Sequence, residues 1–263
     1  MVFVIYNVKL DFKNPAFIFI YKYKYIKMKN LNIFSLVTEY ENAKSGGVLN
    51  VPNISFIDED SSVRYLLKLD FTHNGYEYVD LGLPSGLKWA TCNVGATSPE
   101  EYGLYFAWGE TTGYTADDVT SGVRSFTQNE YKAGPAASIS TNLTLVHDAA
   151  HINMGGDWRM PTKDEYQELI DNCDTMWTDD YNGTGVKGRV FTSKVNGKLV
   201  FFPVAGTCGD SGIYGLDEIG YYWSTSWNSS ISSWYFNVNS YDQYITRDGS
   251  RRYYGRTLRG VFK

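Results

Sequence analysis

The clearest alternation of apolar and polar positions lies near the carboxyl end, over residues 233–239. Side chains of a β-strand point alternately to its two faces, so this alternation predicts a strand with one buried face and one displayed face. The positions expected to face a core are Trp234, Phe236 and Val238. The positions expected to face solvent are Ser233, Tyr235, Asn237 and Asn239.

Short apolar stretches separated by turn residues predict further strands upstream. Strands over 76–81 and 87–94 bracket Pro84-Ser85-Gly86, which predicts a β-hairpin. A second hairpin is predicted over 190–194 and 198–204, because Asn196-Gly197 is a strong signal for a type I′ turn. The carboxyl-terminal part is again expected to be strand, in at least three pieces.

Two helices are predicted between these strands. The first, over 98–103, opens with Ser-Pro-Glu-Glu, which places proline at the first helical position and acidic residues where the helix dipole favours them. The second begins at Thr162, where Thr-Lys-Asp-Glu has the spacing of a capping box. Apolar residues then recur on one helical face as far as Cys173, so this helix is expected to pack against a sheet.

The first 27 residues differ in composition from the rest. Of these, 19 are Phe, Ile, Tyr, Asn or Lys, whose codons begin with two A/T bases, as in translated AT-rich upstream DNA. We therefore expect residues 1–27 to be a non-native or disordered leader and the natural start to be Met28. The alternative is a genuine β-hairpin or interfacial segment. The apolar piece within 17–26 is too short and too rich in lysine for a membrane span, and no cleavage site of a secretory signal follows it.

Residues 28–74 are expected to form a small attachment region. Residues 31–43 have helical spacing, Gly46-Gly47 would end that helix, and 51–58 and 62–69 have the pattern of two strands. Because an isolated hairpin is barely stable in water, this region is expected to dock on the main domain or on a partner.

Charge and ligand chemistry exclude several classes of function. Lys and Arg number 24 against 29 Asp and Glu, a net charge of −5, which argues against nucleic acid as the main partner. The three cysteines, Cys92, Cys173 and Cys208, provide neither a disulfide framework nor a CxxC pair, although one disulfide is open to them. With three histidines and no Cys/His cluster, no metal site and no cofactor is expected.

Residues 221–256 have the composition of a recognition surface. Of these 36 residues, 21 are Tyr, Trp, Ser or Asn, four are Arg, and none is Lys. Tyr and Trp supply rigid contact area, Ser and Asn supply adaptable hydrogen bonds, and Lys is depleted at interfaces. The alternative is a polar, aromatic-rich sheet surface with no partner. The residues predicted to bind a ligand are Trp227, Asn228, Ser230, Ser232, Tyr235, Asn237, Asn239, Tyr241, Asp242, Tyr244, Arg247, Asp248, Arg251, Arg252, Tyr253, Tyr254 and Arg256.

Five ordered motifs carry a resemblance to a known family. They occupy residues 78–96, 105–110, 156–162, 222–225 and 258–261. From about Gly75 to the end, the chain resembles the Fibrobacter succinogenes major paralogous domain family, which occurs in gut Bacteroidetes and their phages. The residue patterns alone indicate a mixed α+β domain. The resemblance implies, for residues 75–263, a C-type lectin-like fold with two helices and a twisted, mainly antiparallel sheet.

This fold also carries variable proteins that retroelements diversify at adenines in the last part of the gene. Residues reachable from Asn codons are frequent in such targets, and undiversified relatives share a similar tail. The residues of that kind here are Asn228, Ser230, Ser232, Tyr235, Asn237, Asn239, Tyr241, Asp242, Tyr244, Thr246, Asp248, Ser250, Tyr253 and Tyr254.

Two departures from relatives of this fold limit the implied chemistry. Lectins that bind sugar through calcium use a Trp-Asn-Asp strand, whereas Trp227-Asn228-Ser229 lacks the acid. The formylglycine-generating enzyme needs a late pair of reactive cysteines, and no cysteine follows Cys208. Asp148 and His151 have the spacing of an acid/base pair, but a capping hydrogen bond is the favoured interpretation.

We therefore expect a binding or adhesion module and not an enzyme. It would display residues 227–256 to a protein or glycan receptor on a cell surface, with an acidic glycan or acidic protein patch as the natural partner, because the segment carries four Arg. A virion or cell-surface location fits this role, and the sequence leaves the oligomeric state open. The alternatives are a structural subunit of a particle or surface layer, or an enzyme related to the formylglycine-generating enzyme.

Overall fold

The computed structural model describes residues 9–10, 18–21, 24–27, 49–53, 68–210, 212–246 and 251–263, with side chains from residue 72 onward. The chain divides into two compact units, Met1–Gly75 and Tyr76–Lys263. The remainder of the expected leader, the helix expected over 31–43 and most of the strand expected over 62–69 lie outside the described residues.

The first unit contains five described strands. They are β1 (Lys9–Leu10), β2 (Ile18–Tyr21), β3 (Lys24–Lys27), β4 (Leu49–Asn53) and β5 (Lys68–His73). Antiparallel pairing joins β1 to β2, β2 to β3, and β4 to β5.

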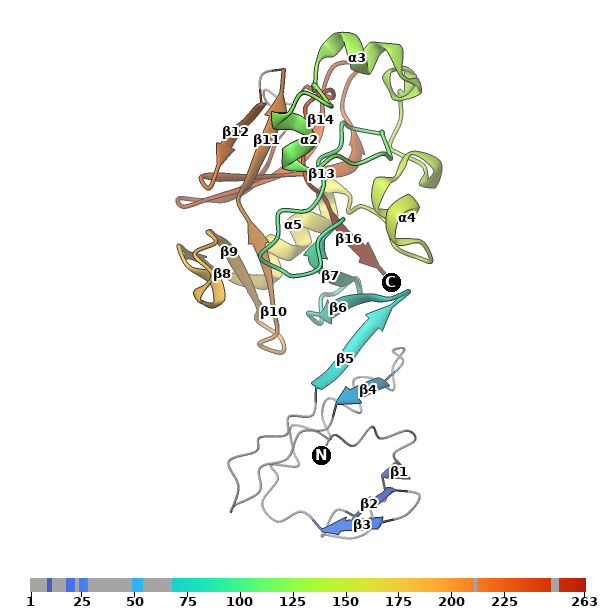
Figure 1. The fold of residues 1–263 in the computed structure, drawn as a ribbon, viewed down its shortest axis with the longest axis vertical. Coiled ribbons are helices and arrows are strands. Elements are labelled where there is room, and N and C mark those ends of the chain that lie inside the picture. Colours follow the sequence, from blue (N-terminus) through green and yellow to red (C-terminus); the bar gives the residue numbers. More distant parts are fainter. Residues whose placement is uncertain are drawn as a thin grey trace. The chain divides into compact units, whose positions relative to one another are not determined.

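The second unit, the main unit, is an α+β domain with short helices and mainly antiparallel sheets (Figure 1). Its helices are α2 (Ala116–Thr120), α3 (Gln128–Ala133), α4 (Ala149–Met154) and α5 (Lys163–Asn172), with the 3-10 turns η1 (Pro135–Ser138), η2 (Leu145–His147) and η3 (Tyr181–Gly183). In the part of the chain that the structure describes, no helix has the length and apolar character needed to cross a membrane.

Three groups of strands build the main unit. The first contains β6 (Tyr76–Asp80), β7 (Lys88–Asn93) and β16 (Arg259–Phe262) in the order β16-β7-β6, and the second contains β8 (Cys173–Thr178), β9 (Gly188–Ser193) and β10 (Leu199–Pro203) in the order β10-β9-β8. The third contains β11 (Ala205–Gly209), β12 (Gly212–Leu216), β13 (Ile219–Trp227), β14 (Ser233–Asn239) and β15 (Gln243–Thr246) in the order β12-β11-β13-β14-β15. All pairs are antiparallel except β11 with β13.

Helix α5 begins at the predicted capping box and joins two of these sheets. The Thr162 hydroxyl accepts a hydrogen bond from the Glu165 amide, while the Glu165 carboxylate accepts one from the Thr162 amide. The helix contacts strands of both the β8–β10 sheet and the β11–β15 sheet (Figure 1). Its Tyr166 ring stacks on Phe236 of β14, with centroids 4.7 Å apart. The predicted helix at Thr162 is therefore confirmed.

Buried hydrogen bonds join residues of the motifs behind the family resemblance. The Trp108 indole donates a hydrogen bond to the Ser224 carbonyl, and the Trp223 indole donates one to the Phe106 carbonyl. Arg259, which has no exposed surface, donates to the Ala90 and Thr91 carbonyls and to Asn93 Oδ1. A buried guanidinium with these acceptors satisfies its donors inside the fold. The motif residues therefore hold the scaffold together.

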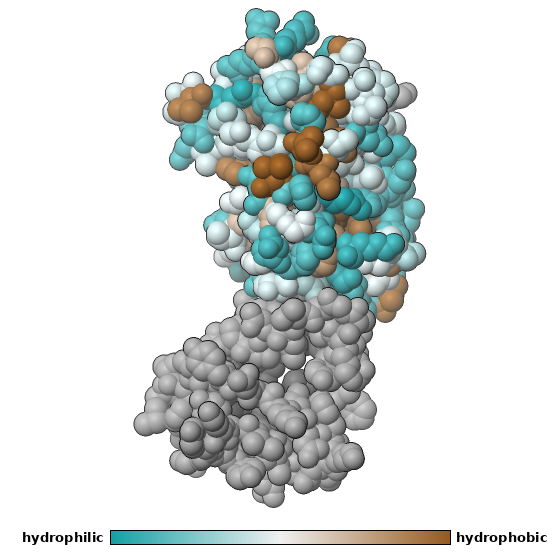
Figure 2. Space-filling model, turned by 90° about the vertical axis from the view of Figure 1, so that its right-hand side faces the viewer, coloured by the Kyte–Doolittle hydropathy of each residue, from teal (hydrophilic) through white to brown (hydrophobic). Residues whose placement is uncertain are grey.

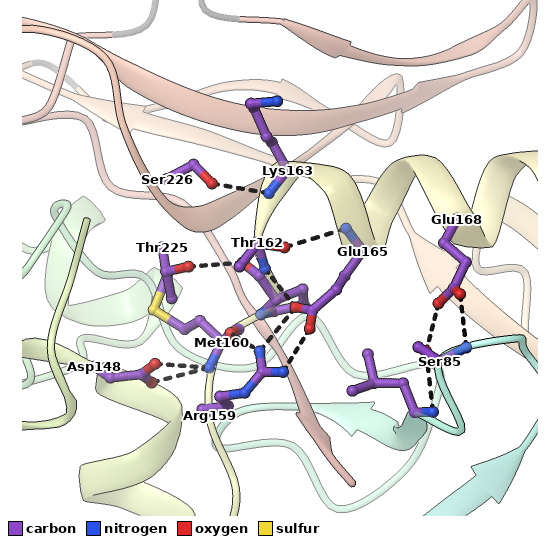
Figure 3. A network of polar contacts seen from close by, with 12 residues as sticks. Ser85, Asp148, Arg159, Met160, Thr162, Lys163, Glu165, Glu168, Thr225 and Ser226 are labelled. Atoms are coloured by element: carbon purple, nitrogen blue, oxygen red, sulfur yellow. Dashed lines mark hydrogen bonds and ion pairs between the residues drawn. The ribbon is translucent and has the colours of Figure 1, made fainter. Parts of the chain in front are cut away.

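A polar network fixes the segment before α5 (Figure 3). The Arg159 guanidinium donates two hydrogen bonds to the Glu165 carboxylate, at 2.8 and 2.5 Å. Burial raises the pKa of Glu165, but the hydrogen bonds from Arg159 and Thr162 outweigh it and hold that pKa below its usual range. Asp148 caps α4 by accepting from the His151 amide and also accepts from the Met160 amide. The capping interpretation of Asp148 is therefore confirmed.

Several sequence predictions of local structure need correction. Residues 98–103 form turns, because the Glu101 carboxylate accepts from Thr97 and Gly103 takes a φ of +75° only a few residues later. The short helices α2, α3 and α4 were not predicted, so the main unit has more helices than expected. Both predicted hairpins form. The Asn196-Gly197 turn is not type I′, which needs a positive φ at both central residues, because only Gly197 has one.

Candidate functional site

Strand β14 does not display one face to solvent as its alternating pattern predicts. Phe236 and Val238 face the core as expected, while Trp234 is half-buried at its rim. On the other face, however, Ser233, Tyr235 and Asn237 are also buried. The strand lies between β13 and β15, and a later segment of the chain covers its second face. Tyr235 and Asn237 are therefore inaccessible to a large ligand.

The covering segment is residues 251–257, and Arg256 makes its central contacts. The Arg256 guanidinium carbon lies 3.8 Å from the ring centroid of Tyr235 and 4.3 Å from that of Trp223. Burial lowers the pKa of Arg256 to about 10, although the surrounding tyrosines oppose this shift, so the side chain stays charged at neutral pH. Arg256 was predicted to lie on the display surface, and the structure makes it part of the interior.

Arg252 is the second predicted surface arginine that the structure buries, with 1% of its surface exposed. Its guanidinium lies 4.5 Å from the Trp108 ring centroid. It donates to the Tyr131 hydroxyl at 3.0 Å and to three backbone carbonyls, which belong to Ala136 (2.5 Å), Ile139 (2.9 Å) and Ser230 (3.3 Å). Arg252 therefore connects α3 and η1 to the loop between β13 and β14.

The remaining predicted residues separate into two groups at opposite ends of β14. A strand rises about 3.3 Å per residue, so its seven residues set the groups roughly 20 Å apart. The group before the strand contains Trp227, Asn228, Ser230 and Ser232, together with Arg251, Tyr253 and Tyr254 of the covering segment. The group at the carboxyl end of the strand contains Asn239, Tyr241, Asp242 and Tyr244. Arg247 and Asp248 lie outside the described residues.

The group at the carboxyl end of β14 is a hydrogen-bonded turn with one protruding ring. The Asn239 side chain accepts hydrogen bonds from the Tyr241 and Asp242 amides at 2.8 and 2.9 Å. Buried Arg189 donates to the Asn239 carbonyl. Asn side chains commonly hold turns in this way. The Tyr241 side chain is consequently 95% exposed at the tip of the β14–β15 hairpin.

The group before β14 borders an open cleft of about 400 Å³. We call it the cationic cleft. Its described lining residues are Gln128, Tyr131, Lys132, Ala137, Ser230, Ile231, Arg251, Arg252 and Tyr253. Ser230, Arg251, Arg252 and Tyr253 belong to the predicted surface. Predicted residues and a concave surface therefore coincide here.

Local hydrogen bonds determine the shape of the cleft. The Ser229 and Ser232 side chains contact each other at 2.9 Å, and Asn228 donates to the Ser232 hydroxyl at 2.7 Å. The Arg252 amide donates to the Ile231 carbonyl, and a β-bridge joins Ser232 to Arg251. The loop that carries Ser230 is therefore fixed on one side by its own side chains and on the other by residues 251–252.

Helix α3 supplies three of the lining residues that sequence reasoning missed, namely Gln128, Tyr131 and Lys132. Thr127 caps it by accepting a hydrogen bond from the Glu130 amide. Lys132 lies in its last turn, where a cation interacts favourably with the helix dipole. Burial raises the pKa of Tyr131 to about 12, so its hydroxyl is neutral and donates to the Trp108 carbonyl at 2.8 Å. No spacing in the sequence connects this helix to residues more than a hundred positions later.

The sequence also directed attention to the three cysteines and to possible metal ligands. All three cysteines have free thiols, and burial raises the pKa of Cys173 to about 11 and also raises that of Cys208. Within residues 72–210, 212–246 and 251–263, no His, Cys, Asp and Glu side chains cluster as ligands for a metal ion.

Exposed apolar side chains gather on the side of the main unit that bears α3 and α4 (Figure 2). Those of η2 and α4 are Leu145, Val146 and Ile152. They come from a different stretch of the chain than the residues of the cationic cleft.

Comparison of the chain with protein-family models, with curated proteins and with solved structures finds no match.

Proposed function

We propose that the main unit is a C-type lectin-like binding or adhesion module that recognises a receptor through the cationic cleft. The observation that carries this proposal is the convergence of Ser230, Arg251 and Tyr253 with α3 around one concave surface. A concave surface with a few convergent polar groups is the usual form of a ligand site. The five motifs between residues 78 and 261 support the family resemblance behind the fold assignment.

The cleft replaces the broad surface of residues 227–256 as the proposed contact region. The side chains of Tyr235, Asn237 and Arg256 are buried and support the fold, and Arg252 lines the cleft from the interior. Tyr241 and Tyr244 are exposed at the far end of β14 and would be a separate contact of an extended receptor. Rigid support lowers the ordering cost of binding, because the loop and the covering segment are already held in place.

The expected partner and location follow from the same family resemblance. A protein or glycan receptor on a cell surface is the expected partner, and a virion or cell-surface location suits an adhesin of this kind. Retroelement diversification would vary Ser230 and Tyr253 in the cleft and Tyr241 at the hairpin tip, while leaving the buried arginines constant. A reverse transcriptase gene beside a near-copy of the final coding stretch, differing at adenines, would establish it.

The test is binding of the fluorescently labelled full chain to a glycan microarray and to intact Bacteroidetes cells, before and after protease treatment of the cells. We expect binding that falls at least about tenfold in Arg251→Ala and Tyr253→Ala, since hot-spot residues are often Tyr and Arg. Met176→Ala, an exposed residue of β8, is the matched control and should bind normally. Equal binding by all three variants, or no binding to any array or cell, would contradict the proposal.

A second candidate function is a structural subunit of a particle or surface layer. The exposed apolar residues Leu145, Val146 and Ile152 favour it, because apolar side chains left on a surface can mark a protein contact. Sedimentation velocity distinguishes the two functions. Self-association of the full chain that Val146→Ser abolishes would support the structural role, whereas a monomer at all concentrations would exclude it.

A further inference from the structure

The charged residues that line the cationic cleft, among those the structure describes, are all positive. Lys132, Arg251 and Arg252 line it, and none of its described lining residues is acidic. The protein as a whole has a net charge of −5. The nearby acid on α3, Glu130, forms an ion pair with Arg124 at 3.7 Å. A concave surface of one sign attracts ligands of the opposite sign.

Arg251 differs from the other arginines that the structure describes. Arg124 and Arg159 form ion pairs, and Arg189 and Arg259 donate to backbone carbonyls. Arg252 and Arg256 are stacked in the interior. Arg251 is the exposed one, and neither it nor Lys132 makes an ion pair with another described residue. Their charges are therefore available to a ligand.

The neutral groups of the cleft suit a hydroxyl-bearing ligand. Gln128 offers a side-chain amide and Ser230 offers a hydroxyl. Tyr253 offers a half-buried aromatic ring that carries a hydroxyl group. Amides and hydroxyls both donate and accept, as do sugar hydroxyls. A volume of about 400 Å³ lies in the range of small-molecule sites. A peptide would need apolar anchor pockets, and the described aliphatic lining is limited to Ala137 and Ile231.

Hydrogen bonds hold the backbone segment that carries Arg251 in place. The Arg251 backbone is held by its bridge to Ser232 and by the Tyr254 amide, which donates to the Arg251 carbonyl at 3.0 Å. Arg252, the next residue, is anchored by four hydrogen bonds. The Arg251 guanidinium is thus carried by an ordered segment and can form a paired hydrogen bond with a planar carboxylate.

We infer that the cationic cleft binds a saccharide that carries a carboxylate. Arg251 and Lys132 bind the carboxylate, Gln128 and Ser230 bind ring hydroxyls, and the Tyr253 ring supports a face of the sugar. This inference rests on the proposed binding function and names its ligand class. The carboxylate is the part of the ligand that the two available cations recognise.

The test is isothermal titration calorimetry of the full chain at low salt, where charge interactions are least screened. The probes are the methyl glycoside of N-acetylneuraminic acid, oligogalacturonate and a glucuronate disaccharide, each beside its carboxyl methyl ester. We expect at least one acid to bind and its ester to bind at least about tenfold more weakly, because the ester keeps the sugar and removes the charge.

Two charge-removing variants locate the binding. Arg251→Gln and Lys132→Gln should each weaken acid binding by about tenfold, whereas Lys194→Gln, at an exposed lysine beyond β9, should leave it unchanged. Thermal melts that match the unmodified chain would show that each variant is folded. Equal affinity for acid and ester, or an equal loss in Lys194→Gln, would overturn the inference.

Two further probes separate this inference from the proposed function. If a sulfated disaccharide or a tetraglutamate peptide binds at Arg251 and no carboxylated sugar does, the carboxylated-saccharide assignment is wrong and the binding function stands. If neither the saccharides nor the peptide bind, and the microarray and cell assays also show no binding, both fail.

Discussion

The guanidinium of Arg256 lies on the ring of Tyr235, at 3.8 Å from its centroid, and both side chains are almost completely buried. This contact joins the covering segment to β14 and closes the face that the sequence pattern left open. A planar guanidinium stacks on aromatic rings and is less strongly hydrated than an ammonium group. Arg256 is thus suited to a buried aromatic site where lysine would not be.

The first prediction compares one substitution at a buried and an exposed arginine. Arg256→Lys should lower the free energy of unfolding by about 2 kcal/mol, because the ammonium loses the planar stacking and is costlier to bury. Arg251→Lys makes the same change at an exposed side chain and should have an effect within about 0.5 kcal/mol. All seven tryptophans lie in the main unit, so tryptophan fluorescence in urea measures its unfolding. Similar losses in both variants would show that the stacking contributes nothing.

The second prediction concerns Arg252 as the support of the cationic cleft. Arg252→Met should destabilise the main unit by about 3 kcal/mol, because it leaves the carbonyls of Ala136, Ile139 and Ser230 without this donor. Amide hydrogen exchange should accelerate most in η1 and the loop before β14. An even rise in exchange over the whole unit, with no excess in these segments, would contradict the local role.

The third prediction is a pH dependence set by Glu165. Burial raises its pKa, but hydrogen bonds from Arg159 and Thr162 outweigh that effect, so its folded pKa lies below the unfolded value of about 4.3. A lowered carboxylate pKa stabilises the fold above the unfolded pKa, and this stability is lost as the pH falls through the folded pKa. Glu165→Gln should therefore cost about 2 kcal/mol at pH 7 and progressively less below about pH 4.

The control for this pH series is Asp164→Asn on the same helix. Its carboxylate is largely exposed and forms an ion pair with the neighbouring Lys163, so a small effect is expected. Urea unfolding at intervals from acid to neutral pH gives the comparison. A constant difference between Glu165→Gln and the unmodified chain at every pH would contradict the assignment.

The fourth prediction separates backbone conformation from steric contact at two glycines. Gly206 has a φ of +69°, and a Cβ there would lie 2.6 Å from the Tyr214 carbonyl oxygen. Gly215 has a φ of +65°, but its Cβ would meet nothing closer than 3.8 Å. Gly215→Ala should cost about 1 kcal/mol and Gly206→Ala clearly more, because only the latter displaces β12. Equal costs in urea unfolding would show that the strand pair adjusts freely.

Local signals in the sequence were enough to predict several elements. The capping box at Thr162 starts α5, because its hydrogen bonds form within four residues. The hairpins around Ser85 and Asn196 form because turn residues join adjacent strands. The mixed α+β class also follows from such local patterns, whereas the mainly antiparallel sheet was an expectation from the family resemblance.

Elements without strong local signals were missed or misread. Helix α3 is six residues long and has a single buried side chain, Tyr131, so it has no apolar periodicity to detect. The pattern over 98–103 has a favourable first turn but too little length before Gly103 to continue as a helix. Short helices in this protein depend on capping by Thr115, Thr127 and Asp148 and on tertiary contacts.

The sequence by itself determined which segment is rich in residue types that form interfaces, because composition and alternation are properties of consecutive positions. It could not determine which residues of that segment are accessible. Tyr235 alternates with apolar neighbours as a surface residue does, yet it and Arg256 bury each other because the chain returns across β14. Only the tertiary structure shows that the chain returns across β14, since this path depends on contacts between residues far apart in the chain. The same return brings Arg251 beside α3 and forms the cationic cleft.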